Sequence, residues 1–256
     1  MEFQRIRFSI ADGIARIVLD DPATHNAVDL RWTQEIAHAV RCCDSTPGLK
    51  AILIAATGKM FSVGGNINDF MANRDHLQRH VREMTVNFHT AISGLHRMPV
   101  PVLAAVNGMA AGGGFSFVLM SDLAIAKRSA KFNFAYTRSG LTPDGGATFF
   151  LTRLVGPQRA FDLLALNPTL TADEAQQLGL VARVVDDEVF EAEVEKTLQA
   201  LANSPSGAAG RVKLQLRQAM SGTLEEQLEI EGRGIAEMAA RPETLAMLES
   251  FLAKKK

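Results

Sequence analysis

The chain has 256 residues, 47% of them hydrophobic, and its 27 basic side chains nearly balance 28 acidic ones. A net charge of -1 provides no field that would attract nucleic acid or an anionic membrane, so neither is expected as a partner. The longest apolar runs are much shorter than the ~20 residues that span a bilayer. Cys42 and Cys43 are adjacent and cannot form a disulfide framework, which favours a reducing, cytoplasmic location.

The first half of the chain alternates between short apolar runs and amphipathic segments. The segments expected to form strands are residues 3–10, 14–19, 51–56, 100–106 and 123–126. The helices expected between them are residues 30–43, which Asp29 can cap, residues 74–96, and a segment that begins near Phe115. This order is typical of an α/β fold with a largely parallel sheet.

The second half, after about residue 143, changes to helical patterns. A capping box at Thr171–Glu174 begins one helix, and Pro242 can begin the last one. Three further helices are expected over residues 190–202, 207–220 and 223–240. No linker separates the halves and no internal repeat is visible, so the helical region is expected to pack on the core or on a neighbouring subunit.

Two loops concentrate glycine at the carboxyl end of a predicted buried strand. They are residues 58–66, which include Gly64-Gly65, and residues 107–114, which end in Gly112-Gly113-Gly114. Glycine lets the backbone approach a ligand closely, and two converging N–H groups would form an oxyanion hole. Neither loop has the glycine spacing of a dinucleotide fingerprint or of a phosphate-binding P-loop, so both of those functions are disfavoured.

Five segments, taken in order, resemble the crotonase (enoyl-CoA hydratase/isomerase) superfamily. They are Asp21–Val28, Lys59–Asn66, Pro101–Gly114, Gly140–Gly146 and Gly179–Val181. The resemblance implies a fold of repeated ββα turns followed by a C-terminal helical trimerisation region. It divides the chain into a catalytic core over residues 1–195 and a helical region over residues 196–256 that oligomerises and completes the coenzyme A pocket.

The same resemblance implies roles for particular residues. It places the oxyanion donors on the backbone N–H groups of Gly65 and Gly113. The residues implied to bind coenzyme A are Ala27, Val28, Ser62 and Val63, together with Phe251 and Lys254 from the C-terminal helix of a neighbour. Coenzyme A is then part of an acyl-CoA substrate, no separate cofactor is implied, and the expected assembly is a homotrimer or a dimer of trimers.

The family's hydratases use two glutamates, and the matching positions in this chain are Ser116 and Tyr136. Neither side chain can replace a carboxylate that activates water, which disfavours simple hydration. Asp144 remains as a candidate acid/base, because one acid that moves a proton between two carbons is enough to shift a double bond. The neighbouring Phe132, Phe134, Phe149 and Phe150 suggest an apolar site around it. The sequence therefore favours an enoyl-CoA isomerase.

Four other interpretations remain open at this point. Asp144 could be the nucleophile of an acyl-CoA hydrolytic dehalogenase, but the register of the long helix offers Asn87 rather than His89 as its partner base. The chain could hydrate enoyl-CoA through unconventional groups, or bind acyl-CoA without catalysis. Asp144 could also merely cap a helix that begins near Gly145.

A metal site is not expected from the histidines. His76 and His80 have the i, i+4 spacing of metal ligands on a helix, but the charged residues around them predict a solvated helical face. No third ligand is apparent in the sequence, so no metal is predicted.

Overall fold

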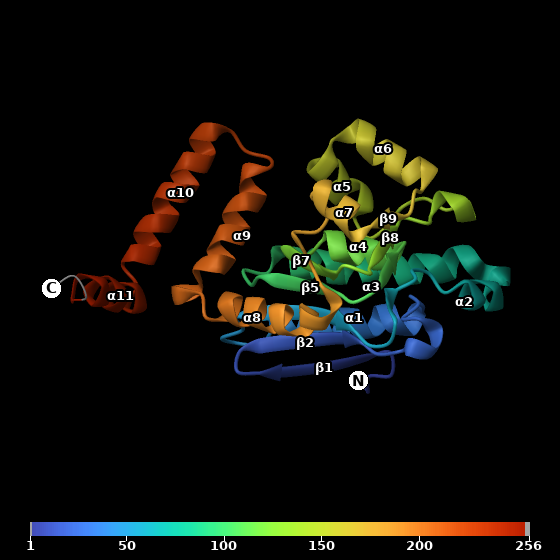
Figure 1. Cartoon of the computed structure of the whole chain (residues 1–256), viewed down its shortest axis with the longest axis horizontal. Coiled ribbons are helices and arrows are strands. Elements are labelled where there is room, and N and C mark those ends of the chain that lie inside the picture. The colour runs from blue at the N-terminus through green and yellow to red at the C-terminus, as the bar shows by residue number, and fades with distance from the viewer. Residues whose placement is uncertain (1, 254–256) are drawn as a thin grey trace.

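Two sheets organise the computed structural model, which describes residues 2–253 (Figure 1). The larger sheet has the strand order β1-β2-β3-β5-β7-β10, and all neighbouring pairs are parallel except the hairpin of β1 with β2. Its strands are β1 (Ile6–Ala11), β2 (Ile14–Leu19), β3 (Ala51–Ala56), β5 (Val102–Val106), β7 (Leu123–Lys127) and β10 (Arg183–Val185).

The smaller sheet has the order β4-β6-β8-β9, and only β9 is antiparallel to its neighbour. Its strands are β4 (Met60–Ser62), β6 (Met109–Ala111), β8 (Lys131–Asn133) and β9 (Leu170–Thr171). Three times in succession the chain passes from a strand of the larger sheet to a strand of the smaller one: β3 to β4, β5 to β6 and β7 to β8. A helical segment follows each pair, so the expected ββα repeat is confirmed although it leaves no visible signal in the sequence.

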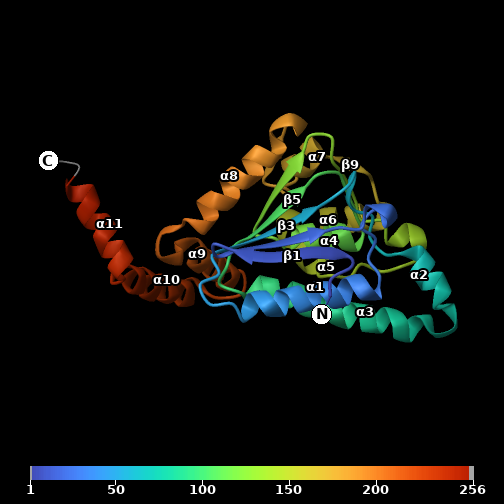
Figure 2. The same ribbon diagram turned by 90° about the horizontal axis from the view of Figure 1, so that it is seen from below.

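Helices cover both faces of the larger sheet, as Figures 1 and 2 show. On one face, α1 (Leu30–Asp44) packs against α3 (Leu77–Arg97), and Trp32 lies 5.6 Å from Phe88 between ring centroids. On the other face, α8 (Phe190–Ala202) buries Phe190, Val194 and Leu198. Successive residues of a strand point to opposite faces, so each central strand contributes to both cores.

The remaining helices are shorter or lie toward the C-terminus. They are α2 (Ile67–Ala72), α4 (Gly113–Leu119), α5 (Ala147–Val155), α6 (Pro157–Leu166), α7 (Ala172–Gln177), α9 (Ala208–Ala219), α10 (Leu224–Ala239) and α11 (Pro242–Ala253). Five 3-10 helices cover Pro22–Thr24, Arg74–His76, Thr137–Ser139, Asp187–Val189 and Pro205–Gly207. Within residues 2–253, no helix combines the length and the apolar character needed to cross a membrane.

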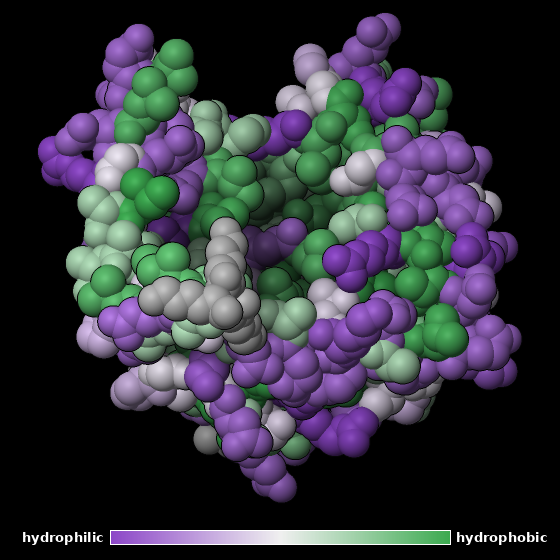
Figure 3. Space-filling model, turned by 60° about the vertical axis from the view of Figure 1, so that its left-hand side comes forward, coloured by the Kyte–Doolittle hydropathy of each residue, from purple (hydrophilic) through white to green (hydrophobic). Residues whose placement is uncertain are grey.

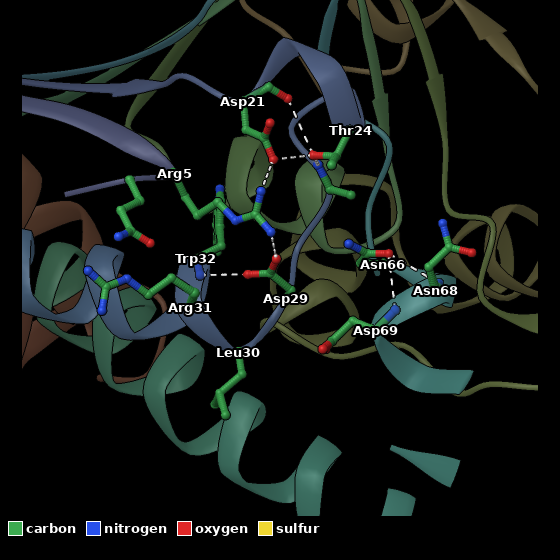
Figure 4. A network of polar contacts seen from close by, with 12 residues as sticks. Arg5, Asp21, Thr24, Asp29, Leu30, Arg31, Trp32, Asn66, Asn68 and Asp69 are labelled. Carbon is green, nitrogen blue, oxygen red and sulfur yellow. Dashed lines mark hydrogen bonds and ion pairs between the residues drawn. The ribbon is translucent and has the colours of Figure 1, made fainter. Parts of the chain in front are cut away.

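A polar network fastens the N-terminal hairpin to the first helix (Figure 4). Arg5 pairs with Asp21 and Asp29, and Asp29 also accepts a hydrogen bond of 2.8 Å from the Trp32 N–H as the cap of α1. Glu35 is fully buried and accepts hydrogen bonds from the backbone N–H groups of residues 4–6. A buried carboxylate is tolerated because these donors replace its hydration. The network holds the loop that leads into the site.

Helices α9–α11 project away from the two sheets, and the C-terminal end of the described chain lies at their far end (Figures 1 and 2). One contact with the core is dense: Lys213 of α9 donates to the carbonyls of Leu95 and Val100 and pairs with Asp122 at 2.8 Å. The expected domain boundary at residue 195 falls inside α8, which packs along the sheet. The helices that leave the core begin after residue 203.

Candidate active site

A cavity of about 320 Å³ opens where α2 and α3 meet the two glycine loops and the segment 135–144. Its wall is mainly apolar, and Asp144 is the one carboxylate among its lining residues. The lining residues are Val28, Thr33, Val63, Gly65, Ile67, Phe70, Val81, Met84, Thr85, Phe88, Gly112, Gly113, Ala135, Tyr136, Ser139, Leu141, Thr142 and Asp144. A concave, mainly apolar space with few polar groups is the usual form of a small-molecule site.

Glycine packing brings the two loops together at this cavity. Gly64 has a φ of +84°, and a Cβ there would lie 2.9 Å from the carbonyl oxygen of Ala111 in the other loop. A Cβ at Gly114 would lie 2.5 Å from the Cβ of Ser62. Larger residues at either position would force the loops apart, and at Gly64 the positive φ is a second reason for glycine.

Gly65 and Gly113 both line the cavity that this packing creates. Gly113 begins α4, where backbone N–H groups have no partner within the helix. Within the described chain, neither the Gly65 nor the Gly113 N–H donates a hydrogen bond to another protein atom. Two free amide donors at one apolar cavity can stabilise an oxygen that becomes negatively charged during a reaction.

Asp144 is held by a hydroxyl chain. The Tyr136 hydroxyl donates to Asp144 Oδ1 at 2.6 Å, and Ser116 Oγ lies 2.9 Å from the same Tyr136 oxygen. Burial and the neighbouring charge of Asp144 raise the pKa of the Tyr136 phenol well above its usual value, so it remains a neutral donor. Helix α5 begins at Ala147 with Gly146 as its cap and no side-chain cap, so Asp144 does not cap it.

His89 of α3 reaches the same carboxylate, contrary to the helical register expected from the sequence. His89 Nε2 lies 3.7 Å from Asp144 Oδ2 and accepts a hydrogen bond of 3.1 Å from the Gly145 N–H. The Asn87 side chain is half-buried and donates to the carbonyl of Glu83 on its own helix, so the expectation of Asn87 was wrong. The helical spacing is consistent with His89 facing the cavity, because His89 continues the i, i+4 row of the lining residues Val81 and Thr85.

The apolar wall also differs from the expectation. Phe132 and Phe134 point into the core against Phe115, at centroid distances of 5.0 and 4.7 Å. Phe149 and Phe150 pack around His96, at the C-terminal end of α3. None of these four phenylalanines lines the cavity, whose apolar wall comes mainly from α2 and α3.

The residues implied to bind coenzyme A fall into three groups. Val28 and Val63 line the cavity, whereas Ala27 and Ser62 are buried outside its wall. Ser62 Oγ donates to the Asn26 carbonyl at 2.7 Å, which fixes the loop before Val28. Phe251 is exposed on α11, far from the cavity along the chain, and Lys254 lies outside the described residues.

His80 is buried rather than solvated, contrary to the expectation for this helical face. Its Nε2 lies 2.7 Å from Asp69 Oδ2, which links α3 to α2 at the cavity wall. Among residues 2–253, no group of three or more His, Cys, Asp or Glu side chains could hold a metal ion.

Comparisons with known proteins show which family the chain resembles. The family model described as enoyl-CoA hydratase/isomerase matches residues 9–256. A probable enoyl-CoA hydratase of Rhodobacter capsulatus is 33% identical over 100% of this chain and 97% of its own. A 4-chlorobenzoyl coenzyme A dehalogenase of an Arthrobacter species is 34% identical, covering 93% and 88%, and the 1,2-epoxyphenylacetyl-CoA isomerase of Escherichia coli is 30% identical, covering 100% and 97%.

Solved structures show the same likeness. A Mycobacterium abscessus structure described as an enoyl-CoA hydratase/isomerase superposes with a TM-score of 0.92 at 32% sequence identity. The match covers 98% of this chain and 97% of the other. The likeness therefore extends over the core and the C-terminal helices together.

Proposed function

The chain belongs to the enoyl-CoA hydratase/isomerase family, and within that family we propose that it is an isomerase that shifts a double bond in an acyl-CoA. The observation that carries the proposal is a single carboxylate, Asp144, in an apolar cavity that also holds two free amide donors. One carboxylate can take a proton from one carbon and return it to another.

The reaction proposed for a 3-enoyl-CoA has two proton transfers. The thioester oxygen accepts hydrogen bonds from the Gly65 and Gly113 N–H groups, and Asp144 removes a proton from carbon 2. The electron pair moves toward the thioester oxygen, and the two amides stabilise the resulting dienolate. Asp144 then returns the proton to carbon 4, which gives the 2-enoyl-CoA with no change in mass.

Hydration is a weaker candidate because it needs a second proton-handling group to activate water. Ser116 and Tyr136 stand where the family's hydratases carry their glutamates, and both hydroxyls are engaged with each other at 2.9 Å. The Tyr136 phenol remains protonated because its pKa is raised by burial and by Asp144. A protonated phenol can donate a hydrogen bond but cannot remove a proton from water.

We further propose that coenzyme A passes Val28 and Val63 and that a neighbouring subunit completes its pocket in a trimer or a dimer of trimers. Helix α11 supports this proposal, because none of its described residues is buried and Phe251 is 59% exposed. The acyl part would occupy the apolar end of the cavity beside Phe70, Met84 and Phe88.

The test is incubation of the purified protein with a 3-enoyl-CoA and, separately, a 2-enoyl-CoA, with the products resolved by chromatography and mass. Isomerisation predicts a product of unchanged mass from the 3-enoyl substrate. A product heavier by one water (~18 Da) would support hydration instead. It would mean that water can be activated without the two glutamates.

Hydrolytic dehalogenation is a second candidate, favoured by the approach of His89 to Asp144. In that reaction Asp144 attacks the ring carbon that carries the halogen, halide leaves, and water then cleaves the aryl ester at the aspartyl carbonyl. The water needs a base, and His89 Nε2 is 3.7 Å from Asp144 Oδ2. The histidine would first have to release the Gly145 N–H, which occupies the Nε2 lone pair.

Chloride release separates the two candidates. The relative from Arthrobacter makes 4-chlorobenzoyl-CoA the natural probe. Release of chloride with formation of 4-hydroxybenzoyl-CoA, lost in His89→Gln, would replace isomerisation as the function. Turnover of a 3-enoyl-CoA that survives His89→Gln, with no chloride release, would support isomerisation.

A further inference from the structure

Tyr136 is the single tyrosine of the chain, and it lies between Asp144, which lines the cavity, and Ser116, which is buried behind the cavity wall. Its hydroxyl is 2.6 Å from Asp144 Oδ1 and 2.9 Å from Ser116 Oγ. Ser116 is completely buried, and its own hydroxyl lies 3.3 Å from the carbonyl oxygen of Gly112, the residue before the oxyanion candidate Gly113. The three side chains thus form one continuous hydrogen-bonded row.

We infer that Tyr136 is a positioning residue for Asp144 and that Ser116 acts only through Tyr136. This inference rests on the proposed function of Asp144 as the proton-transferring group. The phenol occupies Oδ1, so Oδ2 is left as the oxygen that can exchange a proton with substrate. A carboxylate with one oxygen fixed presents the other in a defined direction, which proton transfer requires.

The arrangement also accounts for the choice of reaction. At the two positions where the family's hydratases carry glutamates, this chain has Tyr136, a hydrogen-bond donor, and Ser116, which holds Tyr136 in place. A hydrogen bond donated to a carboxylate stabilises its negative charge, and only a charged carboxylate removes a proton. Tyr136 and Ser116, in place of the two glutamates, would therefore disfavour the addition of water and support proton transfer between two carbons.

A double-mutant cycle tests whether Ser116 acts only through Tyr136. Tyr136→Phe is expected to lower kcat about 10- to 100-fold with KM changed less than about threefold, because a hydrogen bond to a charged group is lost. Ser116→Ala should have a smaller effect of the same kind and no further effect in the Tyr136→Phe background. The matched control is Thr90→Val, which removes an exposed hydroxyl bonded only to its own helix at Val86.

The pH profile provides a readout that a purely structural role would not move. The acid limb of kcat should shift toward higher pH in Tyr136→Phe, because the bond that favours the ionised carboxylate is gone. Global replacement of tyrosine by 3-fluorotyrosine alters position 136 alone, since the chain has one tyrosine. Fluorine makes the phenol a stronger donor, so the limb should shift toward lower pH.

A measurement without turnover separates this inference from the proposed function. With tyrosine labelled at 13Cζ, the single phenol signal should move in Asp144→Asn, and the pKa of Tyr136 should fall because the charge of Asp144 is removed. Asp162→Asn, an exposed aspartate on α6, is the control. A phenol signal unchanged in Asp144→Asn, additive effects in the cycle, or an unmoved acid limb would each overturn the positioning role. A wild-type protein that turns over no enoyl-CoA but shows the expected phenol shift would overturn the proposed function alone.

Discussion

The strands behind the cavity and the C-terminal helices place their apolar residues in opposite ways. Every residue of β5 is buried, whereas α11 has no buried residue within the described chain. Of the 20 exposed large hydrophobic side chains among residues 2–253, eleven lie between residues 212 and 252, a segment that holds about one sixth of the chain. Figure 3 shows such side chains gathered around a hollow on this side of the molecule.

The difference separates what this chain can complete alone from what it cannot. The sheets, the two glycine loops and Asp144 are held by contacts within one chain, so the reaction geometry is intrinsic to it. The exposed faces of α9–α11 present apolar area that would be stabilised by covering, as the proposed assembly would do. Substitutions in the first region should therefore change chemistry or folding, and those in the second should change association.

The largest effect is expected at Asp144. Asp144→Asn should lower kcat by about 10²–10⁴-fold with little change in KM, because the amide cannot take the proton. Stability should hardly change, since the amide can still accept from Tyr136. Steady-state kinetics and thermal unfolding together check this, with Asp162→Asn as the control. Full activity in Asp144→Asn would remove this residue from the mechanism.

The second-largest effect is expected at Lys213, where the C-terminal helices join the core. Its side chain is 3% exposed and pairs with Asp122, so Lys213→Met leaves a carboxylate without its partner. The free energy of unfolding should fall by about 3 kcal/mol, the lower end of the cost of breaking a buried pair. Urea unfolding measures this, and the control is Lys196→Met, whose side chain is 75% exposed. Equal effects in both variants would show that the buried pair does not stabilise the junction.

Neighbouring glycines of the second loop should respond differently. A Cβ at Gly114 would meet Ser62 at 2.5 Å, and Gly114→Ala should destabilise the protein by about 1–3 kcal/mol through overpacking. A Cβ at Gly113 would meet no atom closer than 3.7 Å, so Gly113→Ala should unfold like the wild type while turnover falls, because the methyl group enters the cavity. Comparison of thermal midpoints with kcat/KM tests the pair; reversed effects would contradict the assignment of Gly113 to the site.

The secondary structure of the core was predicted well from the sequence wherever the signal was local. Five of the six strands of the larger sheet were expected from their apolar patterns, whereas the three-residue β10 was not, and the caps at Asp29 and Thr171 formed as expected. The smaller sheet was not predicted, because strands of two or three residues carry no periodicity and exist only through pairing.

The candidate site was predicted where it depends on glycine and missed where it depends on packing. Gly65, Gly113 and Asp144 line one cavity, as the ordered motifs indicated. The sequence favoured Asn87 over His89 as the partner of Asp144, because the face of α3 that meets the site is decided by how α2 and the loops pack against that helix. His89 belongs to the i, i+4 row of Val81 and Thr85, but only this packing turns the row toward the cavity. Phe132 and Phe134 lie on the same side of the β8 segment and pack against Phe115, because successive residues of an extended chain point to opposite sides.

A smaller effect is expected in the pH dependence of stability, through His96 near the C-terminal end of α3. Burial, with Arg217, Lys213 and Arg153 nearby, lowers the pKa of His96 from 6.5 to about 4. A lowered folded pKa gives a stabilising contribution that is complete above pH 6.5 and is lost as the pH falls through about 4. After solvent screening this amounts to about 1–2 kcal/mol. His96→Gln should flatten the pH dependence of the unfolding free energy, whereas His76→Gln, at an exposed position, should not.

The smallest effect on folding is expected where apolar residues are most exposed. Leu216 of α9 is 64% exposed, so Leu216→Glu should change the free energy of unfolding of a single chain by less than about 0.5 kcal/mol. Association is different, because a charge on a face that another subunit covers must be desolvated. Sedimentation velocity should then show smaller species than the wild type, whereas Val86→Glu on α3 should sediment unchanged. If Leu216→Glu also sediments like the wild type, this face of α9 is not the covered one; if it dissociates and loses affinity for coenzyme A with its core intact, the pocket depends on a neighbour while the chemistry does not.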